Sequence, residues 1–332
     1  MKAFVVSTLV CAILILLLRG MAHRWGIVDC PGGRKLHKHP TPTVGGLAMF
    51  VAVLVALMLS DVLQGNVAVL MGSAAALVAL GVLDDKHGLS VSLRMMIQVF
   101  LVTVVIVGAD GTVTHLGALL GADIPLGMFA VPFSVLAFVG GINAINMIDG
   151  ADGMAGKMVL ITTLGVAVIF YLAGALEMLP LTWAMLGALA GFLLLNSRLF
   201  VKRAWVFMGD AGSMWLGLVL GWFMAQVTRG SVAAEPALVL WLFGIPLIDT
   251  LVVMVRRMKR RQSMFAADRT HIHHLLQQAG FTVRRTVLML SLVQLVLVGT
   301  GVFFYYVQAS SYLVFWSFML LMAGYYYRLR NY

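Results

Sequence analysis

The sequence predicts an all-α polytopic membrane protein, and three observations lead to this fold class. First, 61% of the 332 residues are hydrophobic and only 11% are charged, whereas an ordinary soluble domain has about 25% charged residues. Second, apolar runs of roughly the length of a membrane-spanning helix recur along the whole chain. Third, the Lys and Arg residues are concentrated in alternate connecting segments. This composition excludes a cytosolic enzyme, a secreted disulfide scaffold and a disordered regulator.

Eleven apolar runs are candidate transmembrane helices, because a bilayer core of about 30 Å requires about 20 apolar residues. Short polar segments separate the runs, and no internal repeat indicates the inverted halves of a transporter. The first run is interpreted as a helix rather than a signal peptide, because it lacks a small-residue cleavage site. In chain order the runs are 3–19, 44–60, 66–83, 93–108, 125–142, 157–175, 180–196, 212–228, 236–256, 286–308 and 312–327.

The basic residues determine the predicted orientation. Of the 23 Lys and Arg residues, 21 lie in one set of alternate segments, and only Lys2 and Arg229 lie in the other. The positive-inside rule makes the first set cytoplasmic. The N-terminus is then periplasmic and the C-terminus cytoplasmic, which requires an odd number of spans. Membrane topology therefore explains most of the net charge of +10, and no nucleic-acid partner is expected.

The chain is predicted to form one integral-membrane domain over residues 1–332. Cys11 and Cys30 are too few for a disulfide framework and are expected to be free thiols. The polar residues that carry chemistry lie on the cytoplasmic side, where we expect a cleft that holds the active site. The cytoplasmic loops are predicted at about 20–43, 84–93, 143–157, 197–212 and 257–285.

Adjacent carboxylates, Asp84 and Asp85, end one apolar run. They repel each other, and a helix C-terminus disfavours negative charge. A metal ion, a cationic partner or a proton-transfer role explains them better than packing does. Arg94 opens the next run on the same face, where its guanidinium can hold a phosphate.

Polar side chains three residues apart form a stripe at the end of another run. Asn143, Asn146, Asp149 and Asp152 offer only hard oxygen ligands and amide donors. That set suits Mg²⁺ with a phosphate, or the edge of a nucleotide base. The segment is not an EF-hand, because it is too short and lacks the terminal Glu.

Two glycine-containing segments begin helices on the same face. Asp210 stands between glycines, which indicates a corner for metal and phosphate, although Asp before Gly is also a common helix cap. Gly45 and Gly46 follow two prolines and allow close backbone approach, and the alternative there is an ordinary turn.

The longest cytoplasmic loop carries three histidines, His271, His273 and His274. Zinc is disfavoured, because His273 points away from the helix face that the other two share and no Cys or Glu lies at zincin spacing. The imidazoles are expected to contact a phosphate or a sugar. Asp249 lies well inside a span, so it is a functional candidate. The alternative is that it pairs with an arginine of the basic loop.

This set of residues favours phosphoryl transfer, whose catalysis consists mostly of positioning and charge neutralisation. The sequence contains no Ser-His-Asp pattern, no Walker loop and no dinucleotide fingerprint beside a strand. A membrane transporter is the main alternative, and a structural or lipid-binding membrane protein is a more distant one.

Five segments resemble, in order and spacing, the polyprenyl-phosphate N-acetylhexosamine-1-phosphate transferases of glycosyltransferase family 4. These segments are Lys38 to Gly46, Asp84-Asp85, Asn143 to Gly153, Phe207 to Ser213 and His271 to Leu275. The resemblance covers nearly the whole chain and is closest to the undecaprenyl-phosphate GlcNAc-1-phosphate transferases of bacteria.

The resemblance implies a reaction and its partners. GlcNAc-1-phosphate would move from UDP-GlcNAc to undecaprenyl phosphate with release of UMP, as the first membrane step of O-antigen or other surface polysaccharide synthesis. It further implies a bacterial inner-membrane location and dependence on Mg²⁺, for which Mn²⁺ can substitute. Homodimers occur in the family. GalNAc, FucNAc or QuiNAc donors would keep the same motifs, so the sugar stays open.

The resemblance also implies residue roles at the reacting phosphates. Asp210 would be the principal Mg²⁺ ligand and Asn146 a second contact. Asp84 and Asp85 would handle the lipid phosphate, one of them as a general base. Arg94 occupies the position of a phosphate-binding basic residue.

Further roles concern the nucleotide and the sugar. Phe207 would stack on uracil and Asp152 would hydrogen-bond its edge, with Asn143 and Asp149 in the same nucleotide pocket. The implied phosphate and sugar contacts are Lys38, His271, His273 and His274.

Overall fold

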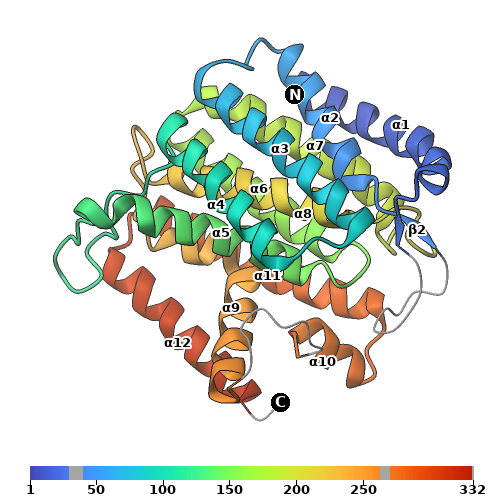
Figure 1. The fold of residues 1–332 in the computed structure, drawn as a ribbon. Coiled ribbons are helices and arrows are strands. Elements are labelled where there is room, and N and C mark those ends of the chain that lie inside the picture. Colours follow the sequence, from blue (N-terminus) through green and yellow to red (C-terminus); the bar gives the residue numbers. More distant parts are fainter. Residues whose placement is uncertain (30–39, 262–269, 331–332) are drawn as a thin grey trace.

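The computed structural model describes residues 1–29, 40–261 and 270–330, and within them the chain forms a helical bundle with one small sheet (Figure 1). The elements are α1 (Lys2–Trp25), β1 (Val28–Asp29), β2 (Thr41–Pro42), α2 (Gly45–Met58), α3 (Gly65–His87), α4 (Val91–Gly108), η1 (Gly127–Phe129), α5 (Ala130–Ile148), α6 (Met154–Leu172), η2 (Leu176–Met178), α7 (Leu179–Asn196), α8 (Gly209–Val227), α9 (Leu238–Lys259), α10 (Ile272–Gln278), α11 (Val283–Tyr306) and α12 (Ser311–Leu329).

Each of the eleven predicted apolar runs falls on a helix, so the prediction of an all-α polytopic membrane protein is confirmed. Among the described residues, eight helical segments are long and apolar enough to cross a membrane. They are α1, α3, α4, η1 with α5, α6, η2 with α7, α9 and α11. The helix α2 is shorter, and α8 and α12 are not among the eight. The total of eleven spans therefore stays a prediction.

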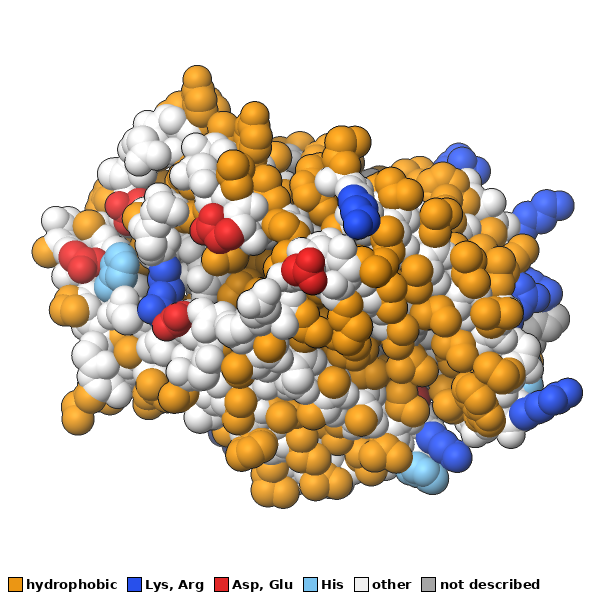
Figure 2. All heavy atoms as spheres, turned by 90° about the horizontal axis from the view of Figure 1, so that it is seen from above, with side chains coloured by type: hydrophobic (Ala, Val, Ile, Leu, Met, Phe, Trp, Pro, Cys, Tyr) orange, Lys and Arg blue, Asp and Glu red, His pale blue; other side chains and the backbone are white. Residues whose placement is uncertain are grey.

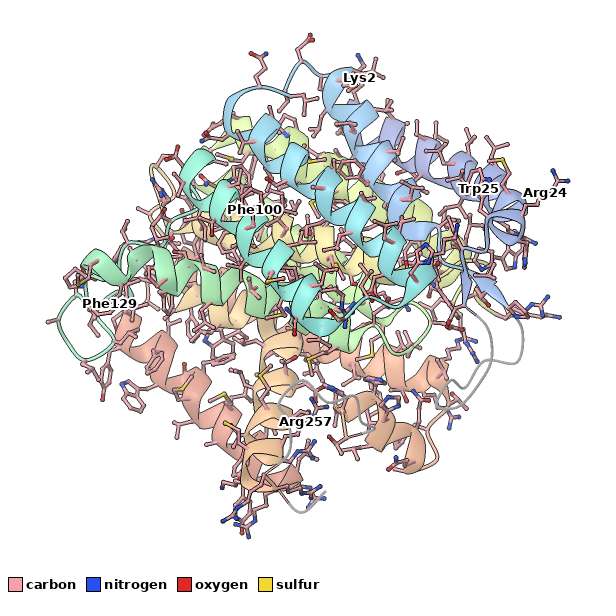
Figure 3. The ribbon with its side chains drawn as sticks, viewed as in Figure 1. Lys2, Arg24, Trp25, Phe100, Phe129 and Arg257 are labelled. Atoms are coloured by element: carbon pink, nitrogen blue, oxygen red, sulfur yellow. The ribbon has the colours of Figure 1, made fainter. Side chains whose placement is uncertain are left out.

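The outer surface of α1 shows how the bundle presents apolar side chains outward. Val5, Leu9, Ile13 and Leu17 are all more than half exposed. Their spacing of four residues places them along one side of the helix. In Figure 3, Lys2 lies near one end of α1, and Arg24 and Trp25 lie near the other. Such a stripe between polar ends suits contact with lipid.

The helix α8 lies at the centre of the bundle, in contact with α2, α3, α5 and α6. Most of its side chains are buried. A Cβ on Gly46 would overlap the backbone of Gly212, and a Cβ on Gly81 would overlap Ala211. Small residues let helix backbones approach closely in membrane proteins. The burial of α8 therefore reflects a position among other helices rather than against lipid.

The helix α9 contains a break, which sends its second half toward α10 and α12 (Figure 1). Gly244 has φ 48° and ψ −120°, and Pro246 follows it. Inside a bilayer the freed backbone groups need partners within the protein. The Gln294 side chain of α11 supplies them: its Oε1 accepts from the N–H of Ile245 at 2.8 Å, and its Nε2 donates to the carbonyl of Leu242 at 3.2 Å.

Charged side chains separate toward the two ends of the molecule. Figure 2 shows Lys and Arg side chains gathered at one end, most of the visible Asp and Glu side chains toward the other, and hydrophobic side chains between them. Figure 3 places Arg257 on the lower half of α9. This separation agrees with the charge asymmetry of the connecting segments.

We predict that Gln294→Leu lowers the free energy of unfolding by about 1–3 kcal/mol, because the Ile245 N–H is left buried without a partner. The measurement is thermal unfolding of the purified protein in detergent. The control is Ser291→Ala, one turn earlier on α11, whose hydroxyl donates only to the Val287 carbonyl of its own helix. Equal melting temperatures for Gln294→Leu and Ser291→Ala would contradict this role of Gln294.

Candidate active site

The ends of four helices meet at the basic end of the bundle. The C-terminal turn of α3 carries the acid pair, α4 begins just after it, α5 ends in the polar stripe, and α8 begins with the Gly-Asp corner. The segment before α8 is held by β2, because the Phe207 N–H donates to the Pro42 carbonyl at 2.7 Å. Gly209 has φ 71°, and a Cβ there would overlap the carboxylate of Asp85. Glycine at this position therefore lets α8 start directly against α3.

Both carboxylate oxygens of Asp84 have hydrogen-bond partners within the bundle. Its Oδ2 lies 2.6 Å from Arg94 Nη1, and its Oδ1 accepts from the Leu89 N–H at 2.7 Å. The residue is 6% exposed. The same Arg94 nitrogen lies 3.8 Å from Asp210 Oδ2. Arg94 is therefore shared between the acid pair and the Gly-Asp corner.

Asp85 keeps one oxygen available. Its Oδ1 accepts from the backbone N–H of Asp210 at 3.0 Å. Its Oδ2 is buried and has no hydrogen-bond partner within the described chain. A buried carboxylate oxygen without a partner is costly. The two neighbouring acids thus have different surroundings, and only Asp85 has an oxygen left for a ligand.

Asn146 joins the polar stripe of α5 to the start of α8. Its Nδ2 donates to Asp210 Oδ1 at 2.5 Å and to Ser213 Oγ at 2.9 Å. The structure therefore brings together five of the predicted site residues, Asp84, Asp85, Arg94, Asn146 and Asp210. Ser213 completes this group, and sequence reasoning assigned it no role.

The loop after α5 adds two more acids. Burial, followed by the negative charges of Asp210 and Asp152, raises the pKa of Asp149 to about 7. Asp152 Oδ2 accepts from Arg198 Nε at 2.6 Å. Arg198 is one of the 21 basic residues that topology alone explains in the sequence, so its pairing with Asp152 is not predicted there. Its only signal was a position shortly after a predicted span.

The histidines lie against this loop. A Cβ on Gly150 would overlap the ring of His273, so the two pack closely. His273 is 1% exposed, and burial together with the nearby charges of His274 and His271 lowers its pKa to about 3. His273 is therefore neutral at pH 7. Contrary to the expectation that it points away, its ring stacks on that of His271, with centroids 6.0 Å apart.

Three predicted site residues have other surroundings. The Asn143 amide turns toward α4, where it donates to Gln98 Oε1 at 3.0 Å. Asp249 pairs with His271 at 2.8 Å, so its partner is a histidine of the site loop and not an arginine of the basic loop. Lys38 lies outside the described residues. The nucleotide role of Asn143 stays a prediction.

The oxygen donors of this corner fit a hard divalent cation. Mg²⁺ prefers carboxylate and amide oxygens as ligands. The corner offers the Asp210 carboxylate, the unpartnered Oδ2 of Asp85 and, after rotation of its amide group by about 180°, the amide oxygen of Asn146. Within residues 1–29, 40–261 and 270–330, no three His, Cys, Asp or Glu side chains are arranged to hold a metal by themselves. Further ligands would therefore come from a substrate or from water.

Comparison with known proteins identifies the family. The profile of glycosyl transferase family 4 matches residues 67–228, which include the acid pair, the polar stripe and the Gly-Asp corner. The undecaprenyl-phosphate alpha-N-acetylglucosaminyl 1-phosphate transferase of Salmonella typhi is 33% identical over 292 residues, which cover 87% of this chain and 80% of that protein. The corresponding protein of Escherichia coli K12 is 32% identical over 286 residues, which cover 86% and 78%.

A relative from another bacterium gives the same result. A probable undecaprenyl-phosphate N-acetylglucosaminyl 1-phosphate transferase of Bacillus subtilis strain 168 is 34% identical over 298 residues, which cover 88% of this chain and 81% of that protein. The resemblance inferred from the five motifs is thus confirmed. The chain belongs to glycosyl transferase family 4.

Proposed function

We propose that this transferase moves GlcNAc-1-phosphate from UDP-GlcNAc to undecaprenyl phosphate and releases UMP. The observation that carries the proposal is the corner where Asp85 and Asp210 lie beside Arg94 at the basic end of a membrane bundle. Acids and a guanidinium held together there suit a metal-bound diphosphate and a lipid phosphate. The names of the relatives in Salmonella typhi and Bacillus subtilis state the same transferred group and the same acceptor.

In the proposed reaction an oxygen of undecaprenyl phosphate attacks the β-phosphorus of UDP-GlcNAc. A new P–O bond forms, the bond between the β-phosphorus and the bridging oxygen breaks, and UMP leaves with that oxygen and its electron pair. Arg94 neutralises phosphate charge at the point of attack. The acceptor phosphate has a second pKa near 6 and is largely ionised at pH 7, so positioning matters more than a general base.

Mg²⁺ is the proposed cofactor, with Mn²⁺ as a substitute, and it would neutralise the diphosphate and stabilise the leaving group. Asp210 would be its principal protein ligand, with Asn146 beside it and the open Oδ2 of Asp85 within the same corner. Asp84 has a different role in this proposal. It holds Arg94 in place through the contact of 2.6 Å.

The nucleotide is proposed to lie over the loop that follows α5. Phe207 would stack on uracil, and Asp152 would accept a hydrogen bond from the edge of the base. Arg198 supports this role, because its contact at 2.6 Å orients the Asp152 carboxylate. Asp149 would lie in the same pocket, and the three histidines would contact the sugar and the diphosphate.

The proposed topology has eleven spans, with the N-terminus periplasmic and the site at the cytoplasmic face of the bacterial inner membrane. The basic and acidic ends seen in Figure 2 support this orientation. The proposed pathway is O-antigen or related surface polysaccharide synthesis. The alternative within the same reaction is another UDP-N-acetylhexosamine, such as one carrying GalNAc, FucNAc or QuiNAc.

The reaction is tested with purified protein, undecaprenyl phosphate, Mg²⁺ and a panel of radiolabelled UDP-sugars. We expect UDP-GlcNAc to give labelled lipid and one equivalent of UMP. If only UDP-GalNAc gave labelled lipid, the assigned sugar would change from GlcNAc to GalNAc, and the reaction class would stay the same. Transfer from none of the donors would contradict the proposed function.

We predict that Asp210→Asn lowers kcat at least 100-fold, because the variant loses the charge proposed to hold the metal ion. Expression and membrane insertion should be unchanged. The matched control is Asp123→Asn, an exposed acid in the connection between α4 and α5, which should retain full turnover. Near-normal UMP release by Asp210→Asn would show that the metal assignment is wrong.

The two acids of the pair should respond differently to substitution. Asp85→Asn should lower kcat at least 100-fold while the melting temperature stays equal or rises, because repulsion with Asp210 is relieved. Asp84→Asn should lower the free energy of unfolding by about 1–3 kcal/mol, because Arg94 loses its buried partner. Thermal unfolding and UMP release measured on both variants check this division. Identical behaviour of the two variants would refute it.

A further inference from the structure

We infer that Asp249 is a positioning residue, which fixes the ring orientation and the protonated nitrogen of His271. The inference rests on the proposed function in assigning His271 to the substrate. The geometry of the pair is independent of that assignment. Asp249 makes no hydrogen bond to Asp84, Asp85 or Asp210, and we infer that it acts through the histidine alone.

Asp249 is 2% exposed and lies five residues after the break at Gly244. Three donors from two distant segments meet its carboxylate. Oδ2 lies 2.8 Å from His271 Nδ1, while Oδ1 accepts from the Ile272 N–H at 3.1 Å and from the Tyr325 hydroxyl at 2.8 Å. The break in α9 thus places one acid where α10 and α12 both reach it.

The pairing determines which ring nitrogen of His271 carries a proton. A carboxylate can only accept, so Nδ1 must be the donor in this contact. Nε2 is then the ring nitrogen left for another partner. A carboxylate that orients an imidazole in this way sets its tautomer as well as its direction.

The orientation of His271 extends to the loop after α5. The rings of His271 and His273 are nearly parallel, with an interplanar angle of 16° and centroids 6.0 Å apart. His273 in turn packs against Gly150, between the two acids of that loop. A change in the direction of the His271 ring would therefore disturb the surface on which we place the nucleotide and diphosphate.

Capping of α10 alone does not explain a carboxylate at this position. The cap residue of α10 makes no side-chain cap hydrogen bond, so the Ile272 N–H needs an external acceptor. A neutral amide oxygen could accept from both Ile272 and Tyr325 without the cost of burying a charge. The contact with His271 is different. An Asn at position 249 could turn its amide N–H toward Nδ1 and would then not require a proton on that nitrogen, whereas a carboxylate can only accept and does require it.

Asp249→Asn is the decisive variant, because it preserves shape and the two neutral hydrogen bonds. We expect kcat/KM to fall about 10- to 100-fold, the range for the loss of an orienting partner, while the melting temperature changes little. The same substitution made in a His271→Gln background should cause no further loss, because the two residues act as one unit. Losses that multiply in the double variant would overturn the inference.

A matched control exists at the opposite end of the same two helices. Glu235, just before α9, accepts from the Ser311 hydroxyl at the start of α12, with no histidine involved. Glu235→Gln therefore removes an acid that joins α9 to α12 and should leave kcat/KM within about twofold. A loss equal to that of Asp249→Asn would indicate a general structural effect and overturn the positioning role.

A spectroscopic readout separates this inference from the proposed function. In protein labelled with ¹⁵N-histidine, the His271 signals are identified by their absence in His271→Gln. We expect a protonated Nδ1 in the natural protein and a changed protonation pattern in Asp249→Asn. An unchanged pattern would overturn the inference even if transfer occurs. A changed pattern would support it even if no UDP-sugar in the panel is a donor.

Discussion

The close approach of α8 to α2 and α3 is the constraint on which the site depends. Gly46 and Gly81 face the backbone of α8 with no room for a Cβ, so the helices meet backbone against backbone. This contact brings the Asp210 N–H to Asp85 at 3.0 Å. Dispersion attraction and shape complementarity support such packing in a bilayer, where burial of apolar surface between helices gives little driving force. A bulkier residue at either position would push the helices apart and separate the acids, although it changes no charged residue.

The break in α9 is a second backbone constraint, and it positions the side of the site that carries the histidines. A straight α9 would satisfy its own hydrogen bonds and would need no Gln294. The break exposes the Ile245 N–H, which α11 satisfies at 2.8 Å. In return, the second half of α9 carries Asp249 to the histidines and Arg256 to the Thr270 carbonyl at 2.6 Å. Two contacts, seven residues apart on α9, thus hold the chain that leads into α10.

The sequence was sufficient to predict the long apolar helices and the acids that meet at the start of α8, but not Ser213 beside them. Apolar runs locate helices because lipid and bundle interior demand the same side chains, and Asp84, Asp85 and Asp210 stood out as acids retained on a basic face. The sequence did not predict which side chains from distant segments pair with each other. The Asp152–Arg198 contact at 2.6 Å depends on how α7 ends, and Tyr325 lies in an apolar run with no signal of its own. Composition also could not distinguish a central helix such as α8 from one that faces lipid.

The acids at the start of α8 repel one another. Burial, together with the negative charges of Asp210 and Asp152, raises the pKa of Asp149 to about 7, while Arg94 already pairs with Asp84. One guanidinium cannot neutralise this group of acids, and the low dielectric at the end of a bundle strengthens their repulsion. The folded chain tolerates the repulsion because glycine contacts and helix packing fix the backbone on every side. An added cation would relieve that repulsion, and under the proposed function this relief contributes to the affinity of the site for a metal-bound diphosphate. The two acids of the pair therefore differ in their surroundings: Asp84 pairs with Arg94, whereas the buried Oδ2 of Asp85 has no partner in the described chain and is the oxygen that we propose faces the metal-bound donor.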